Sequence, residues 1–233
     1  MTLGSPHLHA ATLASTSDRA RELAAAGAPH GTLVTADVQT AGRGRQGRRW
    51  EAPAGSALLC SIVLRDPPEL LPLAGGLAVA RAIGDGARIK WPNDVLLPAG
   101  PGAAPGRKVA GILAEGRPQD GWAVIGIGVN VAVRLEDLPP ELHDTAATLG
   151  LTPADRAIVL ERILRELESA ITLDTAALLA AYRERDALRG RAITWSGGTG
   201  VAAGIDGSGR LVLDLPDGGH VALDAGEVHL GRV

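Results

Sequence analysis

Three apolar segments follow one another with little room between them, and this spacing restricts the fold more than any other feature of the chain. They span 88–97, 108–115 and 122–133, and only 116–121 connects the last two. Parallel strands need a crossover of about a dozen residues or more, whereas antiparallel strands need only a short turn. The segments therefore predict antiparallel strands, with a low-complexity loop over 98–106.

Helix signals and two more strands precede this region. A helix is expected to begin at Ser15, which forms a Ser-x-x-Asp capping arrangement with Asp18, and to end at Gly27. The residues before it, which include His7 and His9, are expected to be frayed. Strands are also predicted over 31–39 and 56–65, and a second helix over 70–83.

A capping pattern and an apolar stripe predict two later helices. Thr152 and Asp155 form a second capping arrangement, with Pro153 at the first helical position. Apolar residues then recur at helical spacing, and another helix is expected over 174–188. The stripe consists of Ile158, Ile163, Leu164, Leu167 and Ile171.

The character of the sequence changes after Gly190. Short β-like segments alternate there with Gly and Asp turns, a pattern typical of a small β-barrel. We therefore predict an α+β protein with two domains, 1–187 and 188–233. The β-like segments are 192–195, 200–205, 210–215 and 220–223.

Composition narrows the classes of function. A net charge of −3 gives no overall attraction to nucleic acid or to an anionic membrane. The single cysteine, Cys60, excludes an internal disulfide and lies in an apolar run typical of a buried, inert thiol. Neither a membrane span nor a secretion signal is visible, so we expect a soluble cytoplasmic protein. The histidines have no spacing that indicates a metal site.

Lysine and asparagine are scarce in this chain. Lys90 and Lys108 are the only lysines among 23 basic residues, and Asn93 and Asn130 are the only asparagines. Arginine replaces lysine as a charge but not as a compact ammonium group on a flexible stem. These four residues are therefore candidates for functional positions, and chance survival at surface sites is the alternative.

The segment 42–47 reads GRGRQG and matches the dinucleotide pattern G-x-G-x-x-G, with Asp66 downstream. That pattern requires a helix to begin within the glycines, and Pro53 and Gly55 exclude a helix long enough to pack. Glycine backbones and arginine side chains also suit a loop that closes over phosphate. A solvated basic loop or an RGG-like strip for nucleic acid is the alternative.

Three further segments carry candidate groups. In the segment KWPND, 90–94, Asp94 is a candidate Mg²⁺ ligand and Asn93 a ligand contact, although an ordinary turn also explains them. Lys108 begins a predicted strand, where its ammonium group suits a carboxylate or phosphate, although such lysines are often only solvated. Glycines within 126–131 indicate close approach of a ligand or another backbone.

Taken together and in order, these segments resemble the catalytic domain of biotin–protein ligases. The resemblance rests on Ser15-Thr16, 39–50, 90–94, 107–113 and 126–130, and 223–228 is similar to the family's C-terminal barrel. It implies a mixed or antiparallel sheet like that of class II aminoacyl-tRNA synthetases, with flanking helices and an SH3-like β-barrel after it. It also implies biotin and ATP as substrates, Mg²⁺ as activator, and a biotin carboxyl carrier domain as partner.

The resemblance also implies roles for individual residues. Lys108, Arg43 and Arg45 would be catalytic, because they offset the repulsion between the biotin carboxylate and the phosphates. Biotin would be bound by Ser15, Thr16, Gln39, Gly42, Arg43, Arg45, Lys108, Gly111 and Ile112. The nucleotide would be bound by Arg45, Arg48, Trp50, Asn93, Lys108 and Asn130.

Two departures from the family pattern and several alternatives remain. Ser17 stands where the family usually has asparagine. The catalytic pattern begins by residue 15, so we expect no DNA-binding helix-turn-helix domain.

A lipoate or octanoate ligase would use the same chemistry. A nucleic-acid-binding module and a non-catalytic biotin sensor are the other candidates. The sequence leaves a homodimer undecided.

Overall fold

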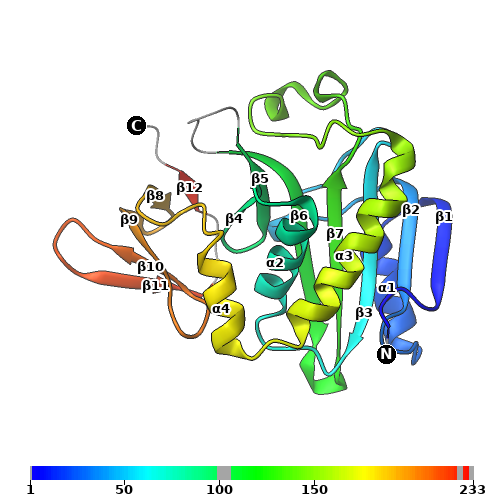
Figure 1. Cartoon of the computed structure of the whole chain (residues 1–233), viewed down its shortest axis with the longest axis horizontal. Coiled ribbons are helices and arrows are strands. Elements are labelled where there is room, and N and C mark those ends of the chain that lie inside the picture. Colours follow the sequence, from blue (N-terminus) through cyan, green and yellow to red (C-terminus); the bar gives the residue numbers. More distant parts are fainter. Residues whose placement is uncertain (1, 99–105, 225–227, 231–233) are drawn as a thin grey trace.

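A mixed sheet forms the centre of the computed structural model, which describes residues 2–98, 106–224 and 228–230. Within them, seven strands pair in the order β1-β2-β3-β7-β6-β5-β4 (Figure 1). All neighbouring strands pair antiparallel except β1 and β2, which are parallel. The short connections predicted this antiparallel pairing for the later strands. The strands are β1 (His7–Leu13), β2 (Leu33–Gln39), β3 (Ala57–Arg65), β4 (Arg88–Lys90), β5 (Asp94–Leu97), β6 (Arg107–Arg117) and β7 (Trp122–Asn130).

The N-terminal residues form a strand, so the prediction that they are frayed was wrong. β1 pairs in parallel with β2, and helix α1 (Thr16–Ala25) is the crossover between them. His7 Nε2 and His9 Nδ1 both lie within hydrogen-bond distance of Thr35 Oγ1, at 2.8 and 3.0 Å. Because these contacts join segments distant in sequence, the local pattern of the N-terminus does not reveal the strand.

The single strand predicted over 88–97 was also wrong, because the chain folds back within it. β4 and β5 form a hairpin in which Lys90 pairs with Asp94. Pro92, in the turn, lacks the backbone N–H that an uninterrupted strand would use, and proline restricts the residue before it. The low-complexity loop predicted over 98–106 lies outside the described residues except at its two ends.

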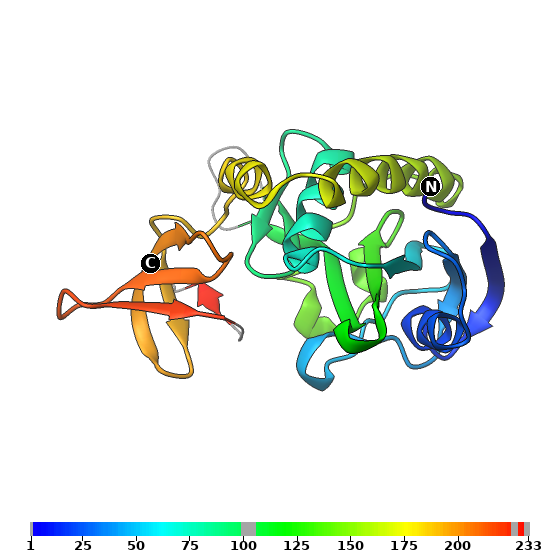
Figure 2. The ribbon, with the colours of Figure 1, turned by 90° about the horizontal axis from the view of Figure 1, so that it is seen from below.

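Helices cover both faces of the sheet. α1 packs on one face, and α2 (Leu71–Ile83) and α3 (Arg156–Ile171) lie together on the other (Figure 2). Neighbouring residues of β7 point to opposite faces, so Val124 joins the cluster under α1 and Ile125 joins the main core. Both faces of the central strands are therefore buried.

The helix signals in the sequence are largely confirmed. Ser15 caps α1 by accepting a hydrogen bond from the Asp18 backbone N–H at 3.3 Å. Thr152 and Asp155 form the predicted capping box before α3. α4 (Thr175–Arg183) follows, and it ends five residues before the end predicted at 188. In α3, Ile163 and Leu167 are fully buried, whereas Ile158 is 47% exposed and does not belong to the buried stripe.

The described part of the C-terminal region forms a second, antiparallel sheet of five strands in the order β11-β10-β9-β8-β12. The hydrophobic core continues into it, because Ile193 and Leu211 belong to the same cluster as Ile89. Trp91 Nε1 also donates to the Gly209 carbonyl at 3.0 Å. The strands are β8 (Ala192–Trp195), β9 (Gly198–Ile205), β10 (Leu211–Asp214), β11 (His220–Leu223) and β12 (His229–Leu230).

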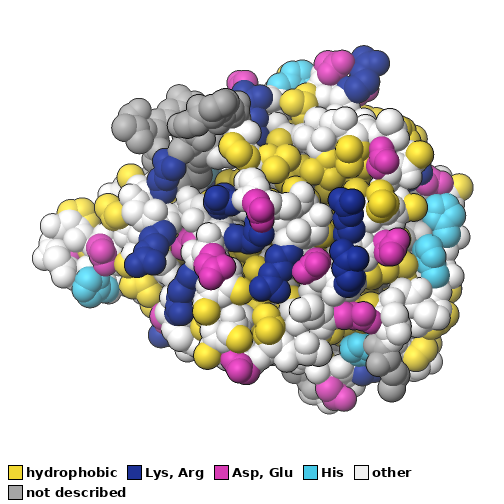
Figure 3. Space-filling view, in the orientation of Figure 1, with side chains coloured by type: hydrophobic (Ala, Val, Ile, Leu, Met, Phe, Trp, Pro, Cys, Tyr) yellow, Lys and Arg dark blue, Asp and Glu magenta, His cyan; other side chains and the backbone are white. Residues whose placement is uncertain are grey.

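Charged side chains of both signs are interspersed on the face that carries α2, α3 and α4 (Figure 3). None of the helices in the described ranges is both long enough and apolar enough to cross a membrane.

Candidate active site

A cavity of about 730 Å³ lies beside β6 and β7, between the loop that follows β2 and the segment that follows β7. Residues from distant parts of the sequence meet there. The cavity is lined by eleven of the thirteen predicted site residues, namely Thr16, Gln39, Arg43, Arg45, Arg48, Trp50, Asn93, Lys108, Gly111, Ile112 and Asn130.

Ser15 and Gly42 lie behind the cavity wall. The Ser15 hydroxyl faces the backbone of α1, whose first turn it caps, and Ser15 is 2% exposed. A β-carbon on Gly42 would lie 2.4 Å from the Trp50 carbonyl oxygen, so no larger residue fits at this point of the loop. In this structure, both residues shape the wall without lining the cavity.

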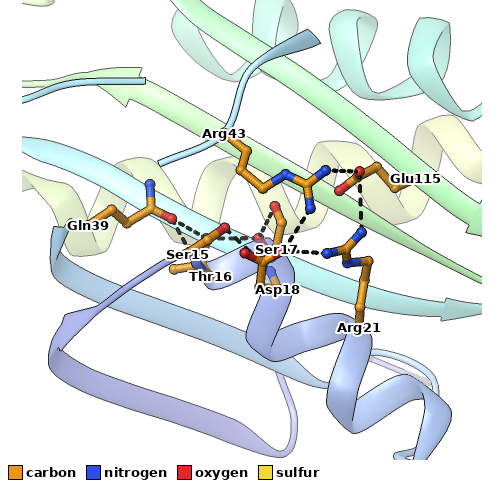
Figure 4. Close-up of polar contacts among 9 residues, drawn as sticks. Ser15, Thr16, Ser17, Asp18, Arg21, Gln39, Arg43 and Glu115 are labelled. Atoms are coloured by element: carbon orange, nitrogen blue, oxygen red, sulfur yellow. Dashed lines mark hydrogen bonds and ion pairs between the residues drawn. The ribbon is translucent and has the colours of Figure 1, made fainter. Parts of the chain in front are cut away.

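Thr16, Ser17 and Gln39, which line the cavity, belong to a network of hydroxyl and amide groups (Figure 4). Gln39 Oε1 accepts from the Thr16 backbone N–H at 2.7 Å and from Thr16 Oγ1 at 3.0 Å. Ser61 Oγ donates to Thr16 Oγ1 at 2.9 Å and lies 3.1 Å from Ser17 Oγ. Such a chain of hydroxyl groups can both donate to and accept from a polar ring.

Ser17 therefore takes part in the polar network although it departs from the family pattern. It is 6% exposed, and its hydroxyl occupies the space beside Gly126, where a β-carbon would lie 2.5 Å from Ser17 Oγ. Gly126 thus leaves room for a side chain of α1, which is one reason for a glycine inside a buried strand.

The Gly/Arg loop, residues 42–50, forms a small hairpin that lines the cavity. The Gly44 N–H donates to the Arg48 carbonyl at 2.7 Å, and the Trp50 N–H donates to the Gly42 carbonyl at 3.1 Å. Gln46 and Gly47, at its tip, have positive φ angles of 55° and 75°. Arg45 Nη1 also donates to Asn93 Oδ1 at 3.2 Å, which joins the loop to the turn between β4 and β5.

The Arg43 guanidinium is bound by two carboxylates. Its Nη1 lies 2.7 Å from Asp18 Oδ1 and its Nη2 lies 2.9 Å from Glu115 Oε1 (Figure 4). The hydrogen bond that Arg43 donates to Asp18 and the charges of both carboxylates raise the pKa of Arg43. The sequence led us to expect that Arg43 faces the carboxylate and phosphates of a ligand. In this structure its guanidinium binds two carboxylates of the protein itself.

Trp50 packs on two glycines of the central strands. A β-carbon on Gly111 would lie 2.9 Å from the Trp50 ring, and one on Gly128 would lie 2.6 Å from it. The sequence predicted close approach of a ligand or a backbone to the glycines within 126–131, and at Gly128 an indole ring lies there. Lys108 Nζ lies 5.5 Å from the centroid of the same ring.

Lys108 and Asp94, which both line the cavity, form an ion pair. Lys108 Nζ lies 2.6 Å from Asp94 Oδ1, and their side chains are 36% and 20% exposed. The Lys108 backbone N–H donates to the Thr145 carbonyl at 2.7 Å, which fixes the strand at this point. A lysine held beside the cavity suits stabilisation of negative charge that develops on a bound ligand.

Sequence reasoning missed one wall of the cavity. After β7, the segment 131–151 crosses the end of β6 and includes the short 3₁₀ helices Leu135–Asp137 and Pro140–Leu142. Asn130 Nδ2 holds this segment by donating to the Ala147 carbonyl at 2.9 Å. The segment has no strong period, so only its clustered leucine and proline residues hinted at structure. Its residues that line the cavity are Leu138, Leu142, Asp144, Thr145 and Ala146.

His229 and Cys60 are among the other residues that line the cavity without having been predicted to do so. His229 reaches it from β12 of the C-terminal sheet. Cys60 lines it from β3 and is 1% exposed, and burial raises the pKa of its thiol to about 12. The prediction of a buried thiol is confirmed, and the raised pKa makes the thiolate scarce at neutral pH.

Comparisons with known proteins agree with this geometry. The model of the biotin/lipoate A/B protein ligase family matches residues 10–131, and that of the biotin protein ligase C-terminal domain matches residues 196–231. The chain is 38% identical over 220 residues to the biotin–[acetyl-CoA-carboxylase] ligase of Mycobacterium tuberculosis, covering 85% of this chain and 78% of that protein. It is 35% identical over 239 residues to the bifunctional ligase/repressor BirA of Bacillus spizizenii, covering 93% and 71%.

The fold of the chain resembles a solved structure over nearly its whole length. The biotin protein ligase from Aquifex aeolicus in complex with biotin and ATP superposes with a TM-score of 0.79 and 27% identity, covering 98% of this chain and 100% of that one. The fold and the sequence matches therefore define a ligase of the biotin and lipoate type. The chain belongs to the biotin/lipoate A/B protein ligase family, and its resemblance to biotin–protein ligases is confirmed.

Proposed function

We propose that this protein activates biotin with ATP, forms biotinyl-5′-AMP and transfers biotin to a lysine of a biotin carboxyl carrier domain. One observation carries the proposal: a single cavity is lined both by Thr16, with its network of hydroxyl groups, and by the charged Lys108. Biotin has a polar ring at one end and a carboxylate at the other, and this arrangement suits both. The ligands named for the Aquifex aeolicus structure support the same assignment.

The chemistry requires charge stabilisation more than a nucleophile. A biotin carboxylate oxygen attacks the α-phosphorus of ATP and pyrophosphate leaves, so two anions must meet. Lys108, Arg45 and Arg48 line the cavity and would stabilise the charge that spreads over the phosphates. The carrier lysine then attacks the acyl carbon and AMP leaves. Loop closure would protect the mixed anhydride from water.

We assign the remaining predicted residues by their positions. Thr16 and Gln39 would bind the biotin ring, and Gly111 and Ile112 would line the rest of its pocket. Trp50, Asn93 and Asn130 would lie on the nucleotide side, where Leu138 and Leu142 add an apolar wall suited to a base. Ser15 and Gly42 would act indirectly, by capping α1 and by shaping the loop.

Asp94 fits a role beside Mg²⁺ only together with the substrate. No group of three or more His, Cys, Asp or Glu side chains within the described ranges can hold a metal ion. Mg²⁺ commonly binds through one or two carboxylates plus substrate phosphates, and Asp94 offers such a carboxylate next to Lys108. The ion would supply further charge neutralisation on the phosphates.

The finer details of architecture are also part of the proposal. We assign residues 1–187 to a catalytic domain with a sheet like that of class II aminoacyl-tRNA synthetases. Residues 188–233 would form an SH3-like barrel, and the antiparallel order of β8 to β12 supports this assignment. His229 brings this second domain to the cavity, so both domains would contribute to the site.

Exchange of labelled pyrophosphate into ATP tests the proposal directly. We expect exchange that depends on biotin and Mg²⁺. Exchange with lipoate or octanoate instead would keep the mechanism but change the substrate. Biotin binding without exchange would favour a sensor. Salt-dependent oligonucleotide binding without exchange would favour a nucleic-acid-binding module.

A further inference from the structure

Four charged side chains form a closed network beside the Gly/Arg loop. Arg43 of the loop bonds to Asp18 of α1 at 2.7 Å and to Glu115 of β6 at 2.9 Å. Arg21 of α1 pairs with Asp18 and lies 3.5 Å from Glu115 (Figure 4). Two arginines and two carboxylates balance, so the network has no net charge.

The network lies at the margin of the cavity. Arg43 lines the cavity, whereas Asp18 and Glu115 do not. The Glu115 side chain is 23% exposed, and those of Asp18 and Arg43 are each 37% exposed, so water screens the ion pairs only in part. Each terminal nitrogen of Arg43 contacts a different element, so one side chain joins the loop to a helix and to a strand.

We propose that Arg43 is a positioning residue that latches the Gly/Arg loop to α1 and β6 through Asp18 and Glu115, and that this latch slows loss of the adenylate. The inference rests on the proposed function for the identity of the adenylate. Arg43 then acts by keeping the loop over the cavity, while Arg45, Arg48 and Lys108 meet the anionic groups.

The charges around Arg43 explain why it is better suited to holding the loop in place than to binding a phosphate. If the guanidinium turned to an anionic ligand, Asp18 and Glu115 would each lose a partner and only Arg21 would remain between them. A phosphate close to Arg43 in its present position would also meet the repulsion of these two carboxylates. A neutral network, by contrast, can hold the loop in place without attracting an anion to its margin.

Asp18→Asn and Glu115→Gln test the latch because they keep the side-chain shapes and do not alter the cavity lining. We expect each to accelerate release of preformed biotinyl-5′-AMP roughly two- to fivefold, the range set by partly exposed ion pairs. Pyrophosphate exchange should stay near the wild-type rate at saturating biotin and ATP. Glu22→Gln is the matched control, because Glu22 pairs with Arg19 on the same helix without contact to the loop.

Arg43→Gln separates a latch from a direct ligand. A latch predicts that Arg43→Gln accelerates release about as much as the Asp18→Asn/Glu115→Gln double variant, and that combining all three substitutions adds little. A strong loss of pyrophosphate exchange in Arg43→Gln, with normal adenylate release in the Asp18 and Glu115 variants, would overturn the proposal.

Trypsin provides a measurement that needs no activity. The loop contains Arg45, Arg48 and Arg49, and cleavage there reports how often the loop opens. The latch predicts faster cleavage at these sites in the Asp18→Asn/Glu115→Gln protein than in wild type or Glu22→Gln. Unchanged cleavage would refute the latch even in an active enzyme. Failure of wild-type pyrophosphate exchange would refute the proposed function and leave this test of the loop intact.

Discussion

The indole ring of Trp50 lies so close to Gly128 that a β-carbon there would be 2.6 Å from ring atom Cε2. The contact joins the end of the Gly/Arg loop to the central strand β7, and Trp50 lines the cavity. The ring also lies against Gly111. A side chain added at either glycine would therefore push the ring away from the sheet.

Gly128→Ala should displace the Trp50 ring. Since β7 is a central strand of the sheet, we expect the ring rather than the backbone to move, with at least a severalfold increase in KM for ATP and altered Trp50 fluorescence. Gly86→Ala is the control, because nothing lies within 4 Å of a β-carbon at Gly86. Unchanged kinetics in Gly128→Ala would show that the position of Trp50 does not matter for the nucleotide.

Lys108→Ala should abolish most adenylate formation but leave folding nearly intact. The Lys108–Asp94 pair is partly exposed, so its loss should cost about 1 kcal/mol or less. Loss of a charge that stabilises the transition state should lower the rate by about a hundredfold or more. Pyrophosphate exchange and thermal unfolding measure the two effects separately, and a mutant that forms adenylate normally would exclude Lys108 from catalysis.

Arg45→Ala should release or hydrolyse the adenylate faster than wild type. The substitution removes the hydrogen bond to Asn93, which ties the loop to the turn between β4 and β5, and also removes a cation from the cavity. Filter retention of labelled adenylate over time measures the loss. Arg134→Ala, at a side chain that is 69% exposed, is the control, and equal retention in the two variants would contradict a role for Arg45.

The Cys60 thiol should make the folded protein less stable in alkaline solution. Burial raises its pKa to about 12 in the folded state, whereas an exposed thiol has a pKa of about 8.5 to 9. The unfolded chain therefore ionises first as the pH rises, and the folded state loses about 1.5 to 2 kcal/mol between pH 8 and pH 10 through this group.

Urea unfolding of wild type and Cys60→Ala at these two pH values measures the effect. The decrease in the free energy of unfolding should be smaller in Cys60→Ala, whatever the absolute stability of the variant. Burial also raises the pKa of Tyr182, so the comparison should stop at pH 10, near the pKa of an exposed tyrosine. Equal decreases in both proteins would mean that the thiol ionises without unfolding.

Local signals were enough to predict much of the fold and many of the candidate residues. The capping hydroxyl of Ser15, the apolar segments of β2 and β3 and the short connection before β7 each depend on neighbours in sequence. The Gly/Arg loop and Lys108 were candidates for a similar reason, because their residue types and their order along the chain carry chemical information.

Only the tertiary structure decided which groups meet. The parallel pairing of β1, the wall formed by 131–151 and the approach of His229 all join segments far apart in sequence. The clearest case is Arg43, whose type predicted an anion ligand but whose guanidinium bonds to Asp18 and to Glu115, 72 residues away. Sequence determined that a cation is present on the loop. The folding of α1 and β6 around it determined its partners, because ion pairing depends on distance in space and not along the chain.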